Sequence, residues 1–80
     1  SRRARETWDK LRPHPDLVQT LGSYLRNSGN LSRTADELRA HRHTVRKRLT
    51  TIEELIEVDL ADPVVAAELL IVAVALRRAD

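Results

Sequence analysis

Hydrophobic side chains recur every three or four positions along most of this chain, which is the spacing of one face of an α-helix. In the first segment they are Ala4, Trp8 and Leu11. A helix there should stop before Pro13, because proline disfavours helical backbone in the residue before it. No segment shows the strict alternation of a β-strand, and the chain contains only 2 glycines. The pattern therefore predicts an all-α chain folded as a small helical bundle.

A second helix should begin at Pro15, since proline suits the first helical turn and the adjacent Asp16 suits the positive end of the helix dipole. Gly29 is expected to end this helix as the glycine after the C-cap. Asn30 can then cap a short third helix that ends near Arg39. The apolar positions are Leu17, Leu21, Tyr24 and Leu25 in the second helix, and Leu31, Ala35 and Leu38 in the third.

After a turn at residues 40–41, a fourth helix is predicted from about Arg42 to Glu57. On a helical wheel of about 100° per residue, its apolar side chains fall within roughly 60° of each other, while a separate arc of about 140° is mostly cationic. One face should therefore join the core and another should be available to an anion. The apolar stripe is Val45, Leu49, Ile52 and Ile56, and the cationic arc holds Arg42, His43, Arg46, Lys47 and Thr50.

The last helix should begin at Asp62 and Pro63, a capping residue followed by a first-turn proline, and reach about Arg78. It is apolar nearly all round, so we expect it to be buried on most sides. Three short helices cannot cover all of it, which predicts contact with a second copy or with a region upstream. The apolar run is interrupted by Glu68 and is too short to span a bilayer comfortably, so no membrane segment is expected.

Charge is distributed unevenly along the chain. Residues 31–50 contain six basic and two acidic side chains, for a net charge of +4. Residues 51–68 contain six acidic and no basic side chains, for a net charge of −6. A basic block beside an acidic block predicts one surface for a polyanion and another that is kept away from it.

Nothing in the sequence indicates an enzyme, a metal site or a cofactor. There is no cysteine, no glycine-rich phosphate loop and no serine in a nucleophile-elbow setting. His41 and His43 are two positions apart and would not face each other on a helix, which makes them a poor metal pair. The acidic residues at 53–62 lack a calcium-loop pattern and are expected to form a solvated face. The absence of cysteine and of a secretory signal predicts a cytoplasmic protein.

Residues 29–49 have the outline of a helix-turn-helix, two short helices joined by a tight turn with the second helix strongly basic. Arginine can donate two hydrogen bonds to guanine in the major groove, and lysine or threonine can hold phosphate. The small Ala35 would let the two helices cross closely, although the turn lacks the glycine often found there. The alternative is a helical oligomerisation or protein-docking module whose basic face is only solvated.

The run GNLSRTADELRAHRHTVRKRLTTIEEL, followed by a Val-Asp-Leu connector, an Asp-Pro step and an apolar helix, resembles the C-terminal DNA-binding domain of PucR/CdaR-type bacterial transcriptional regulators. The resemblance covers about Leu17 to Leu76. Over Gly29–Leu49 the chain also resembles, without gaps, the Fis-type helix-turn-helix. Lys47 departs from the PucR type, in which this position is usually tyrosine.

The resemblance implies a cytoplasmic bacterial regulator that binds duplex DNA as part of a homodimer and has a sensor region upstream. It implies that residues 15–80 form the DNA-binding domain, with residues 1–14 a helical extension or linker. By position, the recognition-helix contacts would be Arg42, Thr44, Arg46 and Lys47, and the phosphate contacts at the supporting helix would be Asn30 and Ser32. Charge and position add His43 on the cationic arc, with Arg33 and Arg48 as further phosphate contacts.

Overall fold

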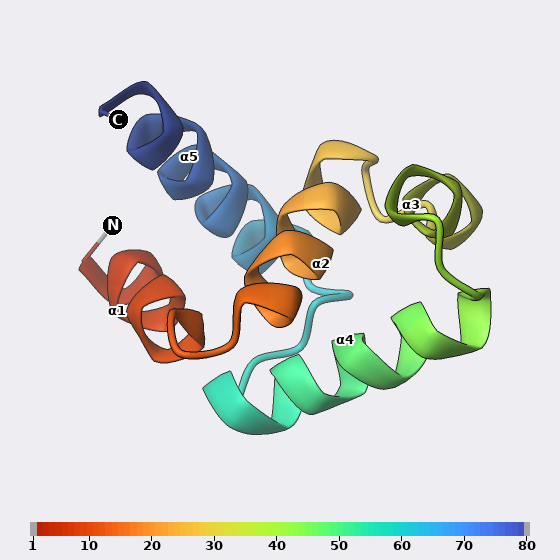
Figure 1. Ribbon diagram of the computed structural model, residues 1–80. Coiled ribbons are helices and arrows are strands. Elements are labelled where there is room, and N and C mark those ends of the chain that lie inside the picture. The colour runs from red at the N-terminus through yellow and green to blue at the C-terminus, as the bar shows by residue number, and fades with distance from the viewer. Residues whose placement is uncertain (1, 80) are drawn as a thin grey trace.

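The computed structural model describes the backbone of residues 2–79 and the side chains of residues 2–77. This part of the chain is all helical apart from its connections, which confirms the predicted fold class (Figure 1). The helices are α1 (Arg2–Leu11), α2 (Pro15–Arg26), α3 (Leu31–Leu38), α4 (Arg42–Ile56) and α5 (Pro63–Ala79).

Helix α2 lies at the centre of the bundle and packs against each of the other four helices. Helix α1 and helix α5 pack together on one side of α2, while α3 and α4 pack together on the other (Figure 1). All five helices contribute to one apolar core, and the predicted stripe of α4 is part of it. The side chains without exposed surface include Leu11, Leu21, Val45 and Ile52.

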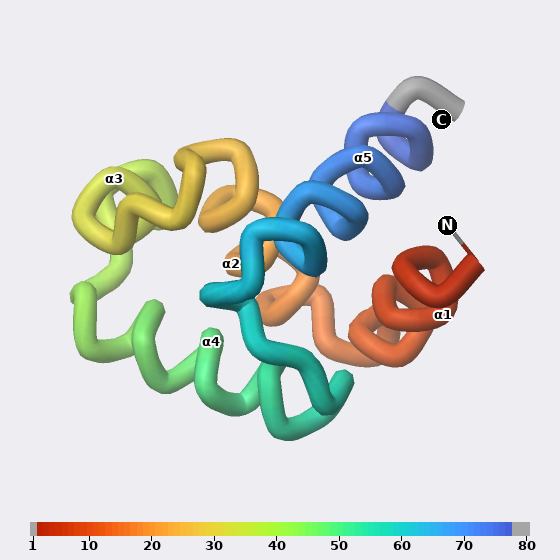
Figure 2. Tube along the Cα trace, turned by 180° about the vertical axis from the view of Figure 1, so that it is seen from behind, coloured from red at the N-terminus to blue at the C-terminus, as the bar shows by residue number. Residues whose placement is uncertain are grey.

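Helix α1 shares this core rather than standing apart from it. Ala4, Trp8 and Leu11 are buried, as the spacing predicted. The indole N–H of Trp8 donates a 3.0 Å hydrogen bond to the backbone carbonyl of Leu69, which ties α1 to α5. Figure 2 shows from behind that the first turn of α1 and the last turns of α5 lie on the same side of the molecule, opposite α3. The two ends of the described chain are therefore remote from the start of α4.

The end of α2 differs from the prediction. The helix stops at Arg26 with Asn27 as its C-cap, three residues before Gly29. Ser28, with φ of 54°, takes the left-handed position after the C-cap that was predicted for Gly29. Gly29 follows it with φ of 76°. The N–H of Gly29 bonds to the carbonyl of Tyr24 at 2.9 Å, and the N–H of Ser28 bonds to that of Leu25 at 3.1 Å. These paired bonds satisfy the last carbonyls of the helix. Gly29, the second left-handed residue, then leads the chain towards α3.

Helix α3 is capped as predicted. The Asn30 side-chain oxygen accepts the N–H of Arg33 at 3.0 Å. The helix ends at Leu38 because Arg39 adopts a left-handed conformation, with φ of 53°. The N–H of Ala40 then bonds to the carbonyl of Ala35 at 3.0 Å and closes the turn. A non-glycine residue therefore makes the tight turn between the two helices of the motif.

The acidic segment between α4 and α5 is more structured than the expected solvated face. Glu53 accepts the backbone N–H of Leu60 at 2.9 Å, which folds the connector back onto α4. Asp62 accepts the N–H of Val64 at 2.9 Å and caps α5, as predicted. Carboxylates are favourable at such helix starts because the free N–H groups there are positively polarised.

Helix α5 is only partly covered by the other helices, as the sequence predicted for a single chain. Leu69 and Val72 are buried against the bundle, but Val64, Ile71 and Val74 are 64%, 66% and 42% exposed. Within one chain, therefore, only one side of this apolar helix is covered. Among the described helices, none combines the length and the apolar character that crossing a bilayer requires.

Candidate nucleic-acid interface

Helix α4 divides into two faces. Val45 and Ile52 have no exposed surface, and Leu49 and Ile56 are buried beside them. On the outside of the helix Arg42, His43, Arg46 and Lys47 are exposed, while Thr44 and Arg48 are half-buried. The same helix therefore anchors itself in the core and presents a row of cations to solvent.

Five of the six outward candidates of α4 line one of two grooves, and Arg42 lines neither. Arg46 lies in a groove of about 360 Å³ with Leu31 at the start of α3 and Tyr24 near the end of α2. On the other flank, a groove of about 430 Å³ runs between α4 and the start of α2. The side chains that line this second groove are His14, Asp16, Leu17, His43, Thr44, Lys47, Arg48 and Thr51.

Arg46 and Lys47 therefore lie on opposite flanks of the outer face. The helical wheel placed both residues in one cationic arc, and in the structure Arg46 lies beside the start of α3. Lys47 lies towards α2 together with Arg48. Arg46 and Lys47 would therefore contact different parts of any large ligand that covers α4.

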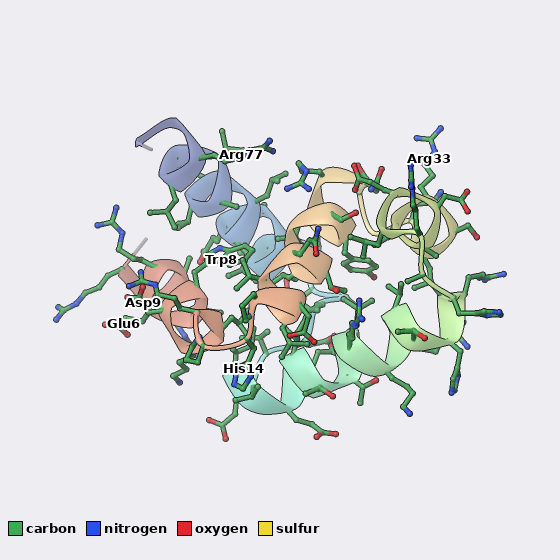
Figure 3. The ribbon with its side chains drawn as sticks, viewed as in Figure 1. Glu6, Trp8, Asp9, His14, Arg33 and Arg77 are labelled. Carbon is green, nitrogen blue, oxygen red and sulfur yellow. The ribbon has the colours of Figure 1, made fainter. Side chains whose placement is uncertain are left out.

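The three candidates at the start of α3 have different surroundings. Asn30 uses its side-chain oxygen to cap the helix. Ser32 and Arg33 are exposed on the first turn. Figure 3 shows Arg33 projecting from α3 away from α4. The structure thus places all three candidates at the start of α3, with the side chain of Arg33 projecting away from the basic row of α4.

Two basic residues near α4 are absent from the sequence-based site. Arg39 is exposed in the turn before α4, and its left-handed backbone could not be assigned from a turn that contains no glycine. His14 precedes α2 and lines the groove with Lys47, although 33 positions separate them in the sequence. Helical periodicity carries no information about this proximity, because His14 precedes α2 and Lys47 lies on α4.

Hydrogen bonding occupies the threonines on the outer side of α4. The hydroxyl of Thr50 donates to the carbonyl of Arg46, and that of Thr51 donates to the carbonyl of Lys47, both at 3.1 Å. Each hydroxyl proton is therefore used within the helix. Donors to a ligand on this face would come from the cationic side chains and from the hydroxyl of Thr44.

A polar cluster fixes α3 against α2. Ser23, which has no exposed surface, donates its hydroxyl proton to the carboxylate of Glu37. The side-chain amide of Asn27 donates to the same carboxylate at 3.1 Å and to the carbonyl of Ser23 at 2.9 Å. The hydrogen bond from Ser23 lowers the pKa of Glu37, and the nearby guanidiniums of Arg26 and Arg77 lower it further. The pairings with Glu37 do not follow from the sequence pattern, because they join side chains ten or more positions apart.

This arrangement can bind a large anion, because the arginine and lysine side chains on one helix provide hydrogen-bond donors and positive charge. In the part of the chain that the structure describes, no group of three or more histidine, aspartate or glutamate side chains is placed to hold a metal ion.

Comparison with known proteins supports the same motif. A protein of Thermomonospora curvata, described as "Uncharacterized protein in pkwA 5'region", is 46% identical over 47 residues, which cover 59% of this chain. The aligned segment spans about a quarter (26%) of the length of that relative. No solved structure matches the chain. The family model of the PucR C-terminal helix-turn-helix domain matches residues 17–77, from the start of α2 to near the end of α5. The matched segment holds α2 to α5 and the whole basic face of α4, and the chain therefore belongs to the family of PucR C-terminal helix-turn-helix domains.

Proposed function

We propose that this chain binds duplex DNA sequence-specifically, through the outer face of α4, as the DNA-binding domain of a bacterial transcription regulator. The observation that carries the proposal is the division of α4 into a buried apolar stripe and an exposed cationic face. In a helix-turn-helix, the second helix enters the major groove while the preceding helix crosses the backbone. Membership of the family supports a DNA-binding role, and the geometry supports α4 as the helix that enters the groove.

The candidate residues would make different contacts with DNA according to their positions. Arg42 and Arg46 would contact base edges, because arginine can donate two hydrogen bonds to one guanine. Lys47 would contact a base edge or the adjacent phosphate from the other flank. The remaining candidates would hold the DNA backbone and fix the register of α4 in the groove. They are Asn30, Ser32, Arg33, His43, Thr44 and Arg48.

The domain would work within a longer cytoplasmic protein. The family match covers only a C-terminal type of domain, and the Thermomonospora curvata relative is several times longer than the segment it shares with this chain. We propose that a sensor region of the same protein controls when α4 engages DNA. The regulated genes and the effector are properties of that whole protein.

The salt dependence of DNA binding tests the proposal. Affinity for a random duplex, measured by fluorescence anisotropy at several salt concentrations, should fall linearly on a log–log plot, because each neutralised phosphate releases condensed counterions. Lys47→Ala should reduce the slope by about 1 if Lys47 contacts a phosphate. Lys10→Ala is the matched control, since Lys10 is exposed on α1, outside the basic face of α4, and its loss should leave the slope unchanged.

The alternative function, a docking module with a solvated basic face, makes the opposite prediction. The chain would then fail to bind duplex DNA at low salt, or would bind with no dependence on salt. Either result would overturn DNA binding through α4.

A further inference from the structure

A groove between α4 and the start of α2 brings together basic side chains from two parts of the chain. His14 and Asp16 line it from the α2 side, and His43, Lys47 and Arg48 line it from α4. Its volume is about 430 Å³, and both histidine side chains are exposed. The family match begins at residue 17, so the family likeness assigns no role to His14.

The basic side chains of this groove are not neutralised by ion pairs within the described domain. The imidazole of His14, the residue before α2, makes no capping hydrogen bond with that helix. Among the described residues, the ion pairs lie within α1 or just after it, outside the groove. They are Arg2–Glu6 and Arg12–Asp9. No carboxylate of α4 is among the residues that line the groove. Its positive charge is therefore left for a ligand from outside.

We propose that this groove binds a phosphate of the DNA backbone, with His14 and His43 joining Lys47 and Arg48 as its contacts. The inference rests on the proposed function, because it requires α4 to lie in the major groove. An imidazole can donate one N–H to a phosphate oxygen when neutral, and it donates from both nitrogens with a full positive charge once protonated. His14 would then be a DNA contact that belongs to neither helix of the helix-turn-helix.

The position of the groove suits the second strand of the duplex. A helix with its side chains is about 10–12 Å across and the major groove is about 12 Å wide, so both flanks of an inserted helix face a phosphate backbone. The flank of α4 that carries Arg46 faces α3, whereas this groove lies on the flank that faces α2. Figure 3 shows His14 beside α4 and well separated from Arg33 on α3. The start of α3 would therefore contact one strand, and His14 would contact the other.

Protonation of the two histidines would strengthen this site. Histidine gains its charge between about pH 8 and pH 5, unlike lysine or arginine. With Lys47, Arg48 and Asp16 ionised, the groove carries a net charge of +1 when both histidines are neutral and +3 when both are protonated. At the end of α1, Arg12 and Asp9 pair with each other and add no net charge. A phosphate favours the protonated imidazoles, so the complex takes up protons and DNA affinity should rise as the pH falls.

Fluorescence anisotropy with a random duplex, from about pH 8 to about pH 5.5, tests the site. A random duplex suffices because phosphate contacts carry no sequence information. The affinity of the wild-type chain should rise by about tenfold for each histidine that is protonated, since a preference of one pKa unit corresponds to a factor of about ten. The slope of log affinity against log salt should also steepen by about 1 per histidine, because each charged contact releases a further counterion. A wild-type affinity that does not change with pH would overturn the proposal.

Substitutions of the histidines identify which of them responds. His14→Gln keeps a hydrogen-bond donor without the charge, and should retain only the part of the pH response that belongs to His43. His14→Lys supplies a permanent charge, and should bind more tightly than the wild type at about pH 8 with the same reduced response. Circular dichroism at both ends of the pH range checks that each variant is folded.

His41→Gln is the matched control. His41 is the third histidine of the chain, and it is exposed at the N-cap of α4 without lining the groove. This variant should therefore keep the full pH response. A full response in His14→Gln, or a response lost in His41→Gln, would overturn the proposal.

Salt dependence separates the failure of this site from that of the proposed function. A chain that binds DNA in a salt-dependent manner without any pH response would retain the proposed function, and only the histidine site would be overturned. A chain that binds no duplex at any pH in this range would overturn both.

Discussion

Helices α4 and α5 are both long and both rich in aliphatic residues, but they use those residues differently. In α4 the apolar side chains occupy one stripe that is buried in the core, and the opposite face is cationic. In α5 the apolar side chains occupy two sides, of which the bundle covers one. In α4 the bundle covers the whole apolar stripe, so the face that remains exposed is the cationic one. A helix that keeps an apolar face uncovered leaves that face available for contacts outside the described bundle.

The largest expected effect comes from shortening the same residue type on the two helices. Ile52→Ala removes a side chain with no exposed surface, and should lower the free energy of unfolding by about 2–5 kcal/mol. Ile71 is 66% exposed, so Ile71→Ala should change the unfolding free energy of the monomer by no more than about 0.5 kcal/mol. Urea denaturation at low protein concentration, followed by circular dichroism, measures both. Equal losses would remove the distinction between the two helices.

On the cationic face, Arg46→Ala should cost about 1–3 kcal/mol of affinity for a defined operator and relax the preference at one base pair. Arg33→Ala should weaken binding to all sequences about equally, because a contact to phosphate carries no sequence information. Competition binding against a panel of single-base operator variants distinguishes the two patterns. The opposite pattern would mean that α3, rather than α4, lies in the groove.

The cap of α3 supports α4 indirectly and can be separated from DNA contact. Asn30→Ala removes the acceptor of the Arg33 N–H and should lower stability by about 1 kcal/mol. Asn30→Asp keeps the acceptor, so thermal unfolding should be close to wild type, but its negative charge should weaken DNA binding if a phosphate lies nearby. An Asn30→Asp variant with unchanged affinity would restrict Asn30 to capping.

The smallest expected effect concerns the cluster that fixes α3 to α2, close to Arg77 of α5. Because the pKa of Glu37 is lowered in the folded protein, ionised Glu37 stabilises the fold above its ordinary pKa of 4.5. That stabilisation is lost as the pH falls through the folded value. Glu37→Gln should therefore be slightly less stable than the wild type at neutral pH, and the difference should disappear in acid. A difference that grows on acidification would contradict this assignment.

The helices were predictable because each buries a stripe with a 3.6-residue period. The start of α4 at Arg42, the cap at Asn30 and the start of α5 at Pro63 all agree with the sequence-based expectation. The end of α2 was not predictable, because Ser28 rather than glycine takes the first left-handed position. Turn conformation at a non-glycine residue depends on tertiary packing and leaves no local signal in the sequence.

The basic face could be located from the sequence, but its internal geometry could not. Periodicity and charge placed Arg42, Arg46 and Lys47 on the outside of one helix, and all three are exposed there. The two flanking grooves and the position of His14 depend on how α4 lies across α2 and α3, which is a long-range property. The contacts of these side chains with DNA remain a prediction. The uncovered side of α5 also depends on packing, since its composition alone does not show which face the bundle takes.

The first turn of α1 and the last turns of α5 lie opposite α3, which bears on how the domain can be handled in the laboratory (Figure 1). A biotin, a fluorophore or a fused carrier protein attached beyond either of these helix ends would therefore join the domain on the α1 and α5 side. A chain immobilised on a sensor surface in this way would present the start of α4 to the solution. Surface-based affinity measurements can therefore be made from either end, and agreement between the two orientations would exclude interference by the attachment.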